Sequence, residues 1–213
     1  YCHLGDHPSL IRPLEACGVT LLPIPILKGG DIDLVSLLQD FDHEAKASVL
    51  AHVNNQTGNE HKVLDLSEKI KKHSPNIHIH IDAVQSFGKL QINLNKNVID
   101  TLSISSHKVG GPKGAGGLYV SNQAKCCPLL DGGGQCEGIR SSTMAAPIIY
   151  SFTAAAHEAF SELDQEFSKV LEIKSHIIKE IKNSNKDILF PFEVAENVSP
   201  YILNMVVPNI SSD

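Results

Sequence analysis

Short apolar runs rich in valine, isoleucine and leucine alternate with amphipathic stretches from Pro8 to Val120. Such alternation is typical of βαβ units, in which helices pack on a mostly parallel sheet. The pattern therefore predicts an α/β layer architecture. In that architecture the polar residues that follow successive strands gather at one edge of the sheet, where open α/β folds bind their ligands.

Periodicity and helix-ending residues predict the individual elements. Helices are expected over residues 8–17, 33–41 and 62–73, and strands over 19–26, 48–53, 77–83, 102–106 and 117–121. Gly18 suits the left-handed conformation that closes many helices, and Pro75 cannot continue the third helix. Strand, turn and helix thus follow one another as a parallel sheet requires.

The strand expected over 77–83 alternates isoleucine with polar residues. Side chains alternate between the two faces of a strand, so the isoleucines at 77, 79 and 81 should face one side. His78, His80 and Asp82 then share the opposite side.

After the loop over 128–142 the composition changes to a long helical stretch, from Met144 to about Ile181. One further strand is expected over 202–207. We predict the main part of a large domain over 1–143, a long connecting helix over 144–182, and the start of a small C-terminal domain over 183–213.

Composition narrows the class of protein. The 213 residues are 42% hydrophobic, enough for one substantial core. Acidic residues (24) outnumber lysine and arginine (18) without long runs, so we expect neither a nucleic-acid nor a membrane partner. No apolar stretch approaches the ~20 residues of a spanning helix, and residues 1–8 lack the regions of a signal peptide. We expect a cytoplasmic protein.

Cysteine usage argues against a disulfide framework, because the count is odd in a mid-sized acidic chain. There is no Cys-x-x-Cys and no nearby histidine at zinc-ligand spacing, so no metal site is predicted on these thiols. The five free thiols are expected at Cys2, Cys17, Cys126, Cys127 and Cys136.

The strongest chemical signal is a lysine at the end of a predicted strand. Ser105-Ser106-His107-Lys108 is followed at once by the glycine-rich segment 110–114. A lysine beside phosphate-binding groups, before a loop without bulky side chains, can present its amine to a bulky planar aldehyde. Lys108 is therefore the candidate for a Schiff-base lysine.

Two other predicted strand ends supply groups that suit the same ligand. If the planar aldehyde carries a pyridine ring, that ring acts as an electron sink only while its nitrogen stays protonated. Keeping the nitrogen protonated requires a nearby carboxylate. Asp82 ends a strand 26 residues (108 − 82) before Lys108. Gln85 lies on the turn that leaves that strand, and Asn55 follows another. Parallel strand ends share one edge, so all four residues should meet.

Four sequence blocks together resemble the cysteine desulfurases (NifS/IscS-like) of the class V aminotransferase superfamily. They are residues 52–58, 80–89, 105–114 and 132–143, in the family's order and spacing. The resemblance covers essentially the whole chain. It implies the large domain of a pyridoxal-phosphate (PLP) transferase of fold type I, with a mostly parallel or mixed sheet, and the start of a small α+β domain.

The resemblance implies a role for each cofactor-site residue. Lys108 would carry PLP as a Schiff base, and Asp82 would pair with the pyridine nitrogen. Gln85 would hydrogen-bond the phenolic oxygen. Ser105 and His107 would hold the phosphate.

Three further roles come from the same resemblance. His7 would stack on the cofactor ring and assist proton transfer. Asn55 would bind the substrate carboxylate as well as lying at the cofactor. Thr143 would reach the phosphate of the neighbouring subunit, so a homodimer is implied.

The implied reaction converts L-cysteine to L-alanine. Sulfur would pass through a persulfide to an acceptor protein, for iron-sulfur clusters or for thiolated cofactors or tRNA. Related superfamily members, selenocysteine lyases and aminotransferases, share the cofactor residues and remain alternatives. A non-catalytic PLP fold kept as an assembly partner is another.

The chain departs from the family pattern in ways that affect these expectations. Cys136-Glu137-Gly138 stands where Glu-Arg-Gly is common, and Ser142 replaces a glycine. The family's phosphate-binding turn should precede Tyr1, and its persulfide-forming cysteine and carboxylate-binding arginine should follow Asp213. We therefore expect a fragment that lacks both ends and is inactive alone. Cys136 is considered as a replacement nucleophile, although a thiol without function is the commoner case.

An alternative from a different class is a metal-dependent hydrolase. His78, His80 and Asp82 spell His-x-His-x-Asp on one strand face, a spacing that also suits metal ligands. This interpretation leaves the Lys108 segment and Asn55 without a role. The PLP interpretation is therefore preferred.

Overall fold

A four-stranded mixed sheet forms the centre of the computed structural model, which describes residues 1–213 except 95–97, 185–186, 193–196 and 211–213. The strands lie in chain order, as β1 (Ala47–Ala51), β2 (His78–Asp82), β3 (Thr101–Ser105) and β4 (Gly116–Val120). The first three are parallel and β4 is antiparallel to β3. The predicted α/β architecture with a mixed sheet is confirmed.

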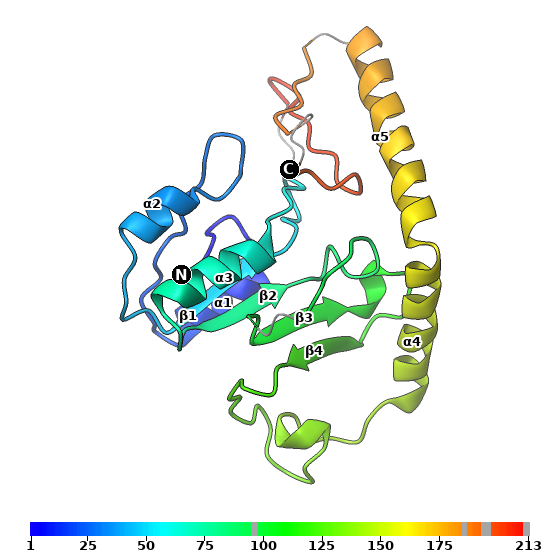
Figure 1. Ribbon diagram of the computed structural model, residues 1–213. Coiled ribbons are helices and arrows are strands. Elements are labelled where there is room, and N and C mark those ends of the chain that lie inside the picture. The colour runs from blue at the N-terminus through cyan, green and yellow to red at the C-terminus, as the bar shows by residue number, and fades with distance from the viewer. Residues whose placement is uncertain (95–97, 185–186, 193–196, 211–213) are drawn as a thin grey trace.

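Helices flank the sheet (Figure 1). They are α1 (Pro8–Ala16), α2 (Leu34–Gln39), α3 (Val63–His73), α4 (Ala146–Ser161) and α5 (Leu163–Ser184). The first three lie within about two residues of their predicted bounds. Across the described part of the chain, no helix combines the length and the apolar character needed to cross a membrane.

The main hydrophobic core lies on the isoleucine face of β2, and the predicted alternation of side chains between its two faces is confirmed. Ile77, Ile79 and Ile81 are at most 1% exposed and belong to one cluster with Leu66 and Ile70 of α3. On the opposite face, both His78 and His80 hydrogen-bond Thr101. The period-two alternation therefore decided which face of β2 is apolar and which is polar.

The strand predicted over 19–26 is wrong, because that segment makes only isolated bridges such as Cys2 with Pro23. Pro23 and Pro25 have no N–H to donate to a ladder. The strand predicted over 202–207 is also wrong. Only Val206 makes a bridge there, with Leu189.

The long helix predicted from Met144 is divided in two. α4 ends at Ser161, and Glu162 leaves the helical region with φ −109° before α5 begins. The Ser161 hydroxyl donates to the Glu158 carbonyl at 2.8 Å, a local bond of the kind that bends helices. The predicted domain boundaries around this region stay a prediction.

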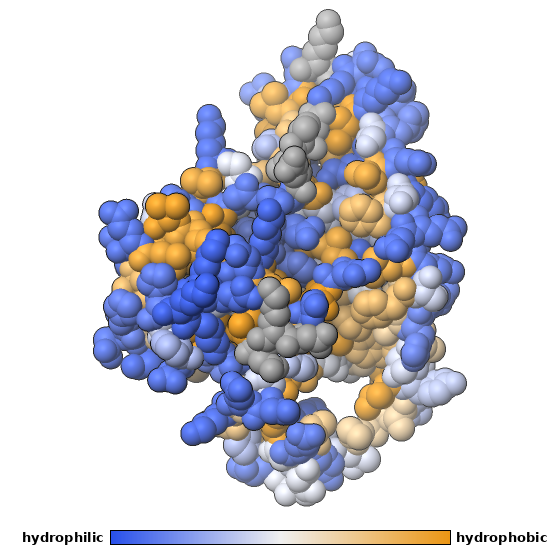
Figure 2. Space-filling view, in the orientation of Figure 1, coloured by the Kyte–Doolittle hydropathy of each residue, from blue (hydrophilic) through white to orange (hydrophobic). Residues whose placement is uncertain are grey.

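The two C-terminal helices form a column beside the sheet (Figure 1). Figure 2 shows apolar side chains along the side of the column turned toward the sheet and polar ones on its outer side. Phe87, from the turn after β2, packs edge-on against Phe152 and Phe160 of α4. These contacts connect α4 to the turn that follows β2.

Candidate active site at the strand ends

A cavity of about 320 Å³ lies at the carboxyl ends of β1, β2 and β3. The structure brings every predicted cofactor residue except Thr143 to its wall. The lining residues are His7, Ser9, Ala51, Val53, Asn55, Asp82, Val84, Gln85, Ser105, His107 and Lys108. Three strand ends far apart in sequence therefore meet in one site, as predicted.

Lys108 reaches the cavity because the chain turns sharply after β3. Ser106 to Lys108 form a single 3-10 turn, η1, in which Ser106 is fully buried. The His107 imidazole Nδ1 lies 2.8 Å from the Ser105 hydroxyl. This turn puts Ser105, His107 and Lys108 on the wall of one cavity, so a hydroxyl, an imidazole and an amine can act on one ligand.

Close packing holds η1 in place. An added Cβ on Gly111 would lie 2.3 Å from the Ser106 hydroxyl oxygen and 3.5 Å from Ala155 of α4. Only a glycine therefore lets the loop pass beneath η1. The glycine-rich segment therefore allows close packing against η1, in addition to leaving room for a ligand beside Lys108.

Asp82, the last residue of β2, is 8% exposed. Its Oδ1 accepts a hydrogen bond from the Val84 N–H at 2.8 Å. Burial raises the pKa of this carboxyl above its usual value, the Val84 bond opposes the rise, and nearby Asp6 adds to it. A cationic ligand group beside Asp82 would favour the charged carboxylate.

His7 stands at the N-cap of α1, where its Nδ1 accepts from the Ser9 N–H at 3.2 Å. In the neutral ring this bond places the proton on Nε2. Ser9 was not predicted, although it lies two residues beyond His7 and also lines the cavity. Ser9 could have been predicted, because it lies in the first turn of the expected helix, next to the candidate residue His7.

Asn55 and Gln85 come from the turns after β1 and β2, and both are half-buried at the cavity wall. Thr143 is exposed and lies in the segment before α4, away from the cavity of its own chain. Its contact with a neighbouring subunit stays a prediction.

Cys136 does not line the cavity. It is exposed, with a left-handed φ of 50°, and its Sγ lies 3.9 Å from the sulfur of Met144. Its position does not support the alternative in which Cys136 replaces the family's nucleophile.

The metal-hydrolase alternative lacks a ligand cluster. Over the residues that the structure describes, no three His, Cys, Asp or Glu side chains gather in an arrangement that could hold a metal ion. His78 and His80 instead share the hydroxyl of Thr101, at 2.8 and 2.9 Å. The His-x-His alternation thus forms a hydrogen-bonded patch on the sheet.

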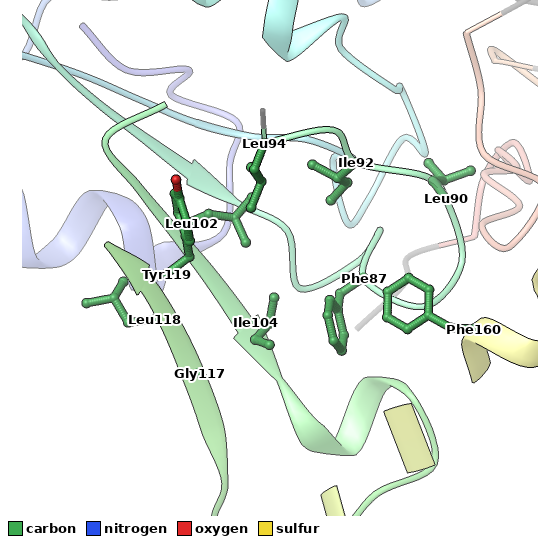
Figure 3. A pocket seen from close by; sticks show the side chains of 10 residues that line it. All are labelled: Phe87, Leu90, Ile92, Leu94, Leu102, Ile104, Gly117, Leu118, Tyr119 and Phe160. Carbon is green, nitrogen blue, oxygen red and sulfur yellow. The ribbon is translucent and has the colours of Figure 1, made fainter. Parts of the chain in front are cut away.

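A second cavity of about 370 Å³ lies between the β3–β4 side of the sheet, the segment 87–94 and Phe160 (Figure 3). Its lining is apolar apart from the Tyr119 hydroxyl. Among the described residues that line it there is no carboxylate, imidazole, amine or thiol, so this lining does not offer the acid-base and nucleophilic groups of the strand-end cavity.

Comparison with known proteins places these features in a family. Residues 5–154 match the aminotransferase class-V family. The chain is 31% identical over 208 residues to the mitosomal cysteine desulfurase of Trachipleistophora hominis, covering 95% of the chain and 47% of the relative. It is 36% identical over 173 residues to cysteine desulfurase IscS of Rickettsia typhi, covering 78% and 42%.

Solved structures show the same similarity. A NifS-like protein superposes with a TM-score of 0.91 at 28% identity, covering 98% of this chain and 57% of that one. SspA in complex with cysteine gives 0.67 at 32% identity, covering 73% and 46%. The chain spans about half the length of the curated relatives it matches.

Proposed function

Because the chain belongs to the aminotransferase class-V family, with cysteine desulfurases among its relatives, we propose that it carries the cofactor site of a PLP-dependent cysteine desulfurase. The observation that carries the proposal is that Lys108 and Asp82 line the same strand-end cavity. An amine for the aldehyde and a buried carboxylate for the pyridine nitrogen are the two groups that PLP chemistry requires of its protein.

The donor set of the cavity fits PLP. Lys108 provides the primary amine, while Ser105 and His107 provide hydrogen-bond donors for a phosphate. The unfavourable burial of the Asp82 charge also fits, because a protonated pyridine nitrogen would offset it. Bound PLP withdraws electrons from the α-carbon of an amino acid and so weakens the bonds to that carbon.

Each chain residue has a task in the proposed reaction. Lys108 Nζ, which lines the cavity, would accept the α-proton of the substrate. His7 Nε2, at the rim, is placed to exchange a proton with the substrate, and the Asn55 amide binds its carboxylate. The similarity to SspA, whose solved structure is a complex with cysteine, supports L-cysteine as the substrate.

The sulfur transfer itself requires a cysteine thiolate that we assign to sequence outside this chain. That thiolate attacks the substrate sulfur, and the carbon-sulfur bond breaks with its electron pair on carbon. Protonation of that carbon, together with return of the α-proton from Lys108 to the α-carbon, completes L-alanine. The sulfur remains on the attacking cysteine as a persulfide and passes to an acceptor protein. A homodimer, in which Thr143 contacts the partner's cofactor, belongs to the same proposal.

Labelling tests the assignment of Lys108. Treatment of the PLP-loaded protein with borohydride should attach the cofactor to the peptide that contains Lys108, as a mass increase in peptide mapping. Lys108→Ala should abolish both this label and turnover, while Lys113→Ala, an exposed lysine in the adjacent loop, should keep them. Labelling of another lysine in the unaltered protein would refute the assignment.

A product assay tests the reaction. With L-cysteine, the protein that contains this chain should form alanine and persulfide sulfur in equal amounts. Turnover with selenocysteine alone, or production of a keto acid, would instead identify a selenocysteine lyase or an aminotransferase.

A further inference from the structure

We propose that Asp6 and Asn54 form a positioning pair that holds His7 and Asn55 at the rim of the strand-end cavity. The pair joins two segments, the one before α1 and the turn after β1. Each member immediately precedes a rim residue in the chain, so its position sets that of its neighbour. An effect of the pair on catalysis rests on the proposed function. The hydrogen bonds of the pair are seen in the structure whether or not that function is correct.

Asp6 has a fully shielded side chain and uses both carboxylate oxygens. Oδ2 accepts from the Ala51 N–H of β1 at 2.8 Å. Oδ1 accepts from the Asn54 side-chain amide at 3.1 Å and lies 3.0 Å from His3 Nδ1. Asp6 therefore binds β1, the turn after β1 and its own segment at once.

The contact with β1 takes the place of a neighbouring strand. β1 is at one end of the described sheet, so its outward N–H groups need acceptors from elsewhere. Tyr1 O accepts from Val49 N at 2.9 Å, and Asp6 accepts from Ala51 N two residues on. Asp6 thus anchors the segment before α1 to the edge of the sheet.

Asn54 is 1% exposed and organises its turn from within. Its amide nitrogen donates to Gly5 O at 2.9 Å and to Asp6. Its Oδ1 accepts from the N–H groups of Gln56 and Thr57, both at 3.0 Å. Only this orientation of the amide satisfies all four partners. Both the nitrogen and the oxygen of the Asn54 side chain are therefore hydrogen-bonded. Asn55 lies in the chain between Asn54 and Gln56, which are joined by one of these bonds.

Exchange of the two side chains tests the pair. Asp6→Asn turns one acceptor into a donor that faces the Asn54 donor, and Asn54→Asp sets two carboxylates against each other. The double variant Asp6→Asn/Asn54→Asp restores a donor opposite an acceptor between the two positions, and the new amide oxygen at position 6 can still accept from the Ala51 N–H. The bond from position 54 to Gly5 O is not restored, so the expected recovery is partial. Recovery in the exchange variant measures coupling between the two positions.

We expect each single variant to bind PLP about tenfold more weakly and the exchange variant to come within about threefold of the unaltered protein. In the cofactor-free protein, the NMR signals of the His7 ring and Asn55 amide should shift in the single variants and return in the exchange variant. Asp65→Asn is the control, because Asp65 is half-exposed on α3 and pairs only with Lys69 among the contacts described. It should change neither readout.

Single variants that lower the melting temperature but keep PLP affinity within twofold and the NMR signals unchanged would overturn the proposal, as would an exchange variant without recovery. One measurement needs no variant. The Asn54 side-chain amide protons should exchange slowly with solvent, and exchange at the rate of an exposed asparagine would overturn the pair. If the unaltered protein binds no PLP, the proposed function fails, while the NMR and exchange results still decide the pairing.

Discussion

Asp82 combines an unfavourable buried charge with a proposed role in cofactor binding. Its pKa is raised above the usual 3.8, mainly by burial. Between 3.8 and the raised value the folded chain binds more protons than the unfolded chain, so this residue lowers stability as pH rises. At neutral pH the carboxylate destabilises the cofactor-free fold. Binding a cationic ring nitrogen would recover that free energy.

Asp82→Asn should therefore stabilise the cofactor-free protein at pH 7 while weakening its hold on PLP. Removing the buried charge should raise the free energy of unfolding by on the order of 1 kcal/mol, since an asparagine oxygen can still accept from Val84 N–H. The gain should vanish below pH 3.8, where both states carry a protonated Asp82. Urea unfolding at several pH values measures the first effect, and PLP titration the second. Lower stability at pH 7 would contradict the expectation.

At the scale of elements, η1 depends on contacts from three directions. β3 leads into it, Gly111 passes between Ser106 and Ala155 of α4, and α4 itself contacts η1. The turn after β2 packs there too, because a Cβ on Gly88 would lie 2.9 Å from Val109 and 3.0 Å from Ala159. The position of Lys108 is thus set by small residues on α4 and in two loops.

Gly111→Ala should displace η1 and lower PLP binding. The added methyl group would overlap the Ser106 hydroxyl oxygen at 2.3 Å and approach the Ser106 carbonyl oxygen at 3.1 Å. Overpacking of this kind typically costs about 1–3 kcal/mol. Gly29→Ala is the matched control, because a Cβ there meets no atom within 4 Å. The prediction would be wrong if Gly111→Ala and Gly29→Ala had the same melting temperature and the same PLP affinity.

At the scale of the whole molecule, the C-terminal segment returns to the site. After α5 the chain comes back beside the turn that follows β1 (Figure 1). Ser199 N donates to Gly58 O at 2.8 Å, and the Asn204 amide donates to Gln56 O at 3.2 Å. Lys174 of α5 donates to Ser199 O at 3.0 Å from a buried position. Residues nearly 150 positions apart therefore support one turn.

One buried histidine, His52, and one half-buried histidine, His80, make the stability of the fold dependent on pH. Burial lowers the pKa of His52 and of His80 to about 4, with smaller contributions from His61 and His78 respectively. The unfolded chain binds protons near pH 6.5, before the folded chain does. The contribution of these two histidines to the free energy of unfolding is therefore fully present above pH 6.5 and is lost as pH falls toward 4.

The free energy of unfolding should fall between pH 6.5 and 4. The limiting slope is about 1.4 kcal/mol per pH unit for each histidine. His80→Gln should remove one such contribution, whereas His176→Gln, on the exposed side of α5, should leave the slope unchanged. Urea denaturation followed by circular dichroism at pH 7.5, 6 and 5 measures the slope. A flat profile would contradict burial of these neutral rings.

Local patterns in the sequence determined most of the sheet and the candidate site. Alternation at 77–81 decided the core face of β2, and strand-end polar residues such as Asp82, Asn55 and Lys108 meet as parallel strands require. These features depend on side-chain period and strand direction, which neighbouring residues already specify.

Only the tertiary structure decided the features that depend on distant partners. A strand needs a neighbour for its backbone groups, and 202–207 has none among the described residues beyond the single bridge at Val206. Ser199, before this segment, and the Asn204 side chain, within it, bond instead to the turn after β1. The pairing of Asp6 with Asn54 escaped prediction for the same reason. The partner of a buried polar side chain is decided only when folding brings two distant segments together. The local spacing of polar and apolar residues carries no information about that contact.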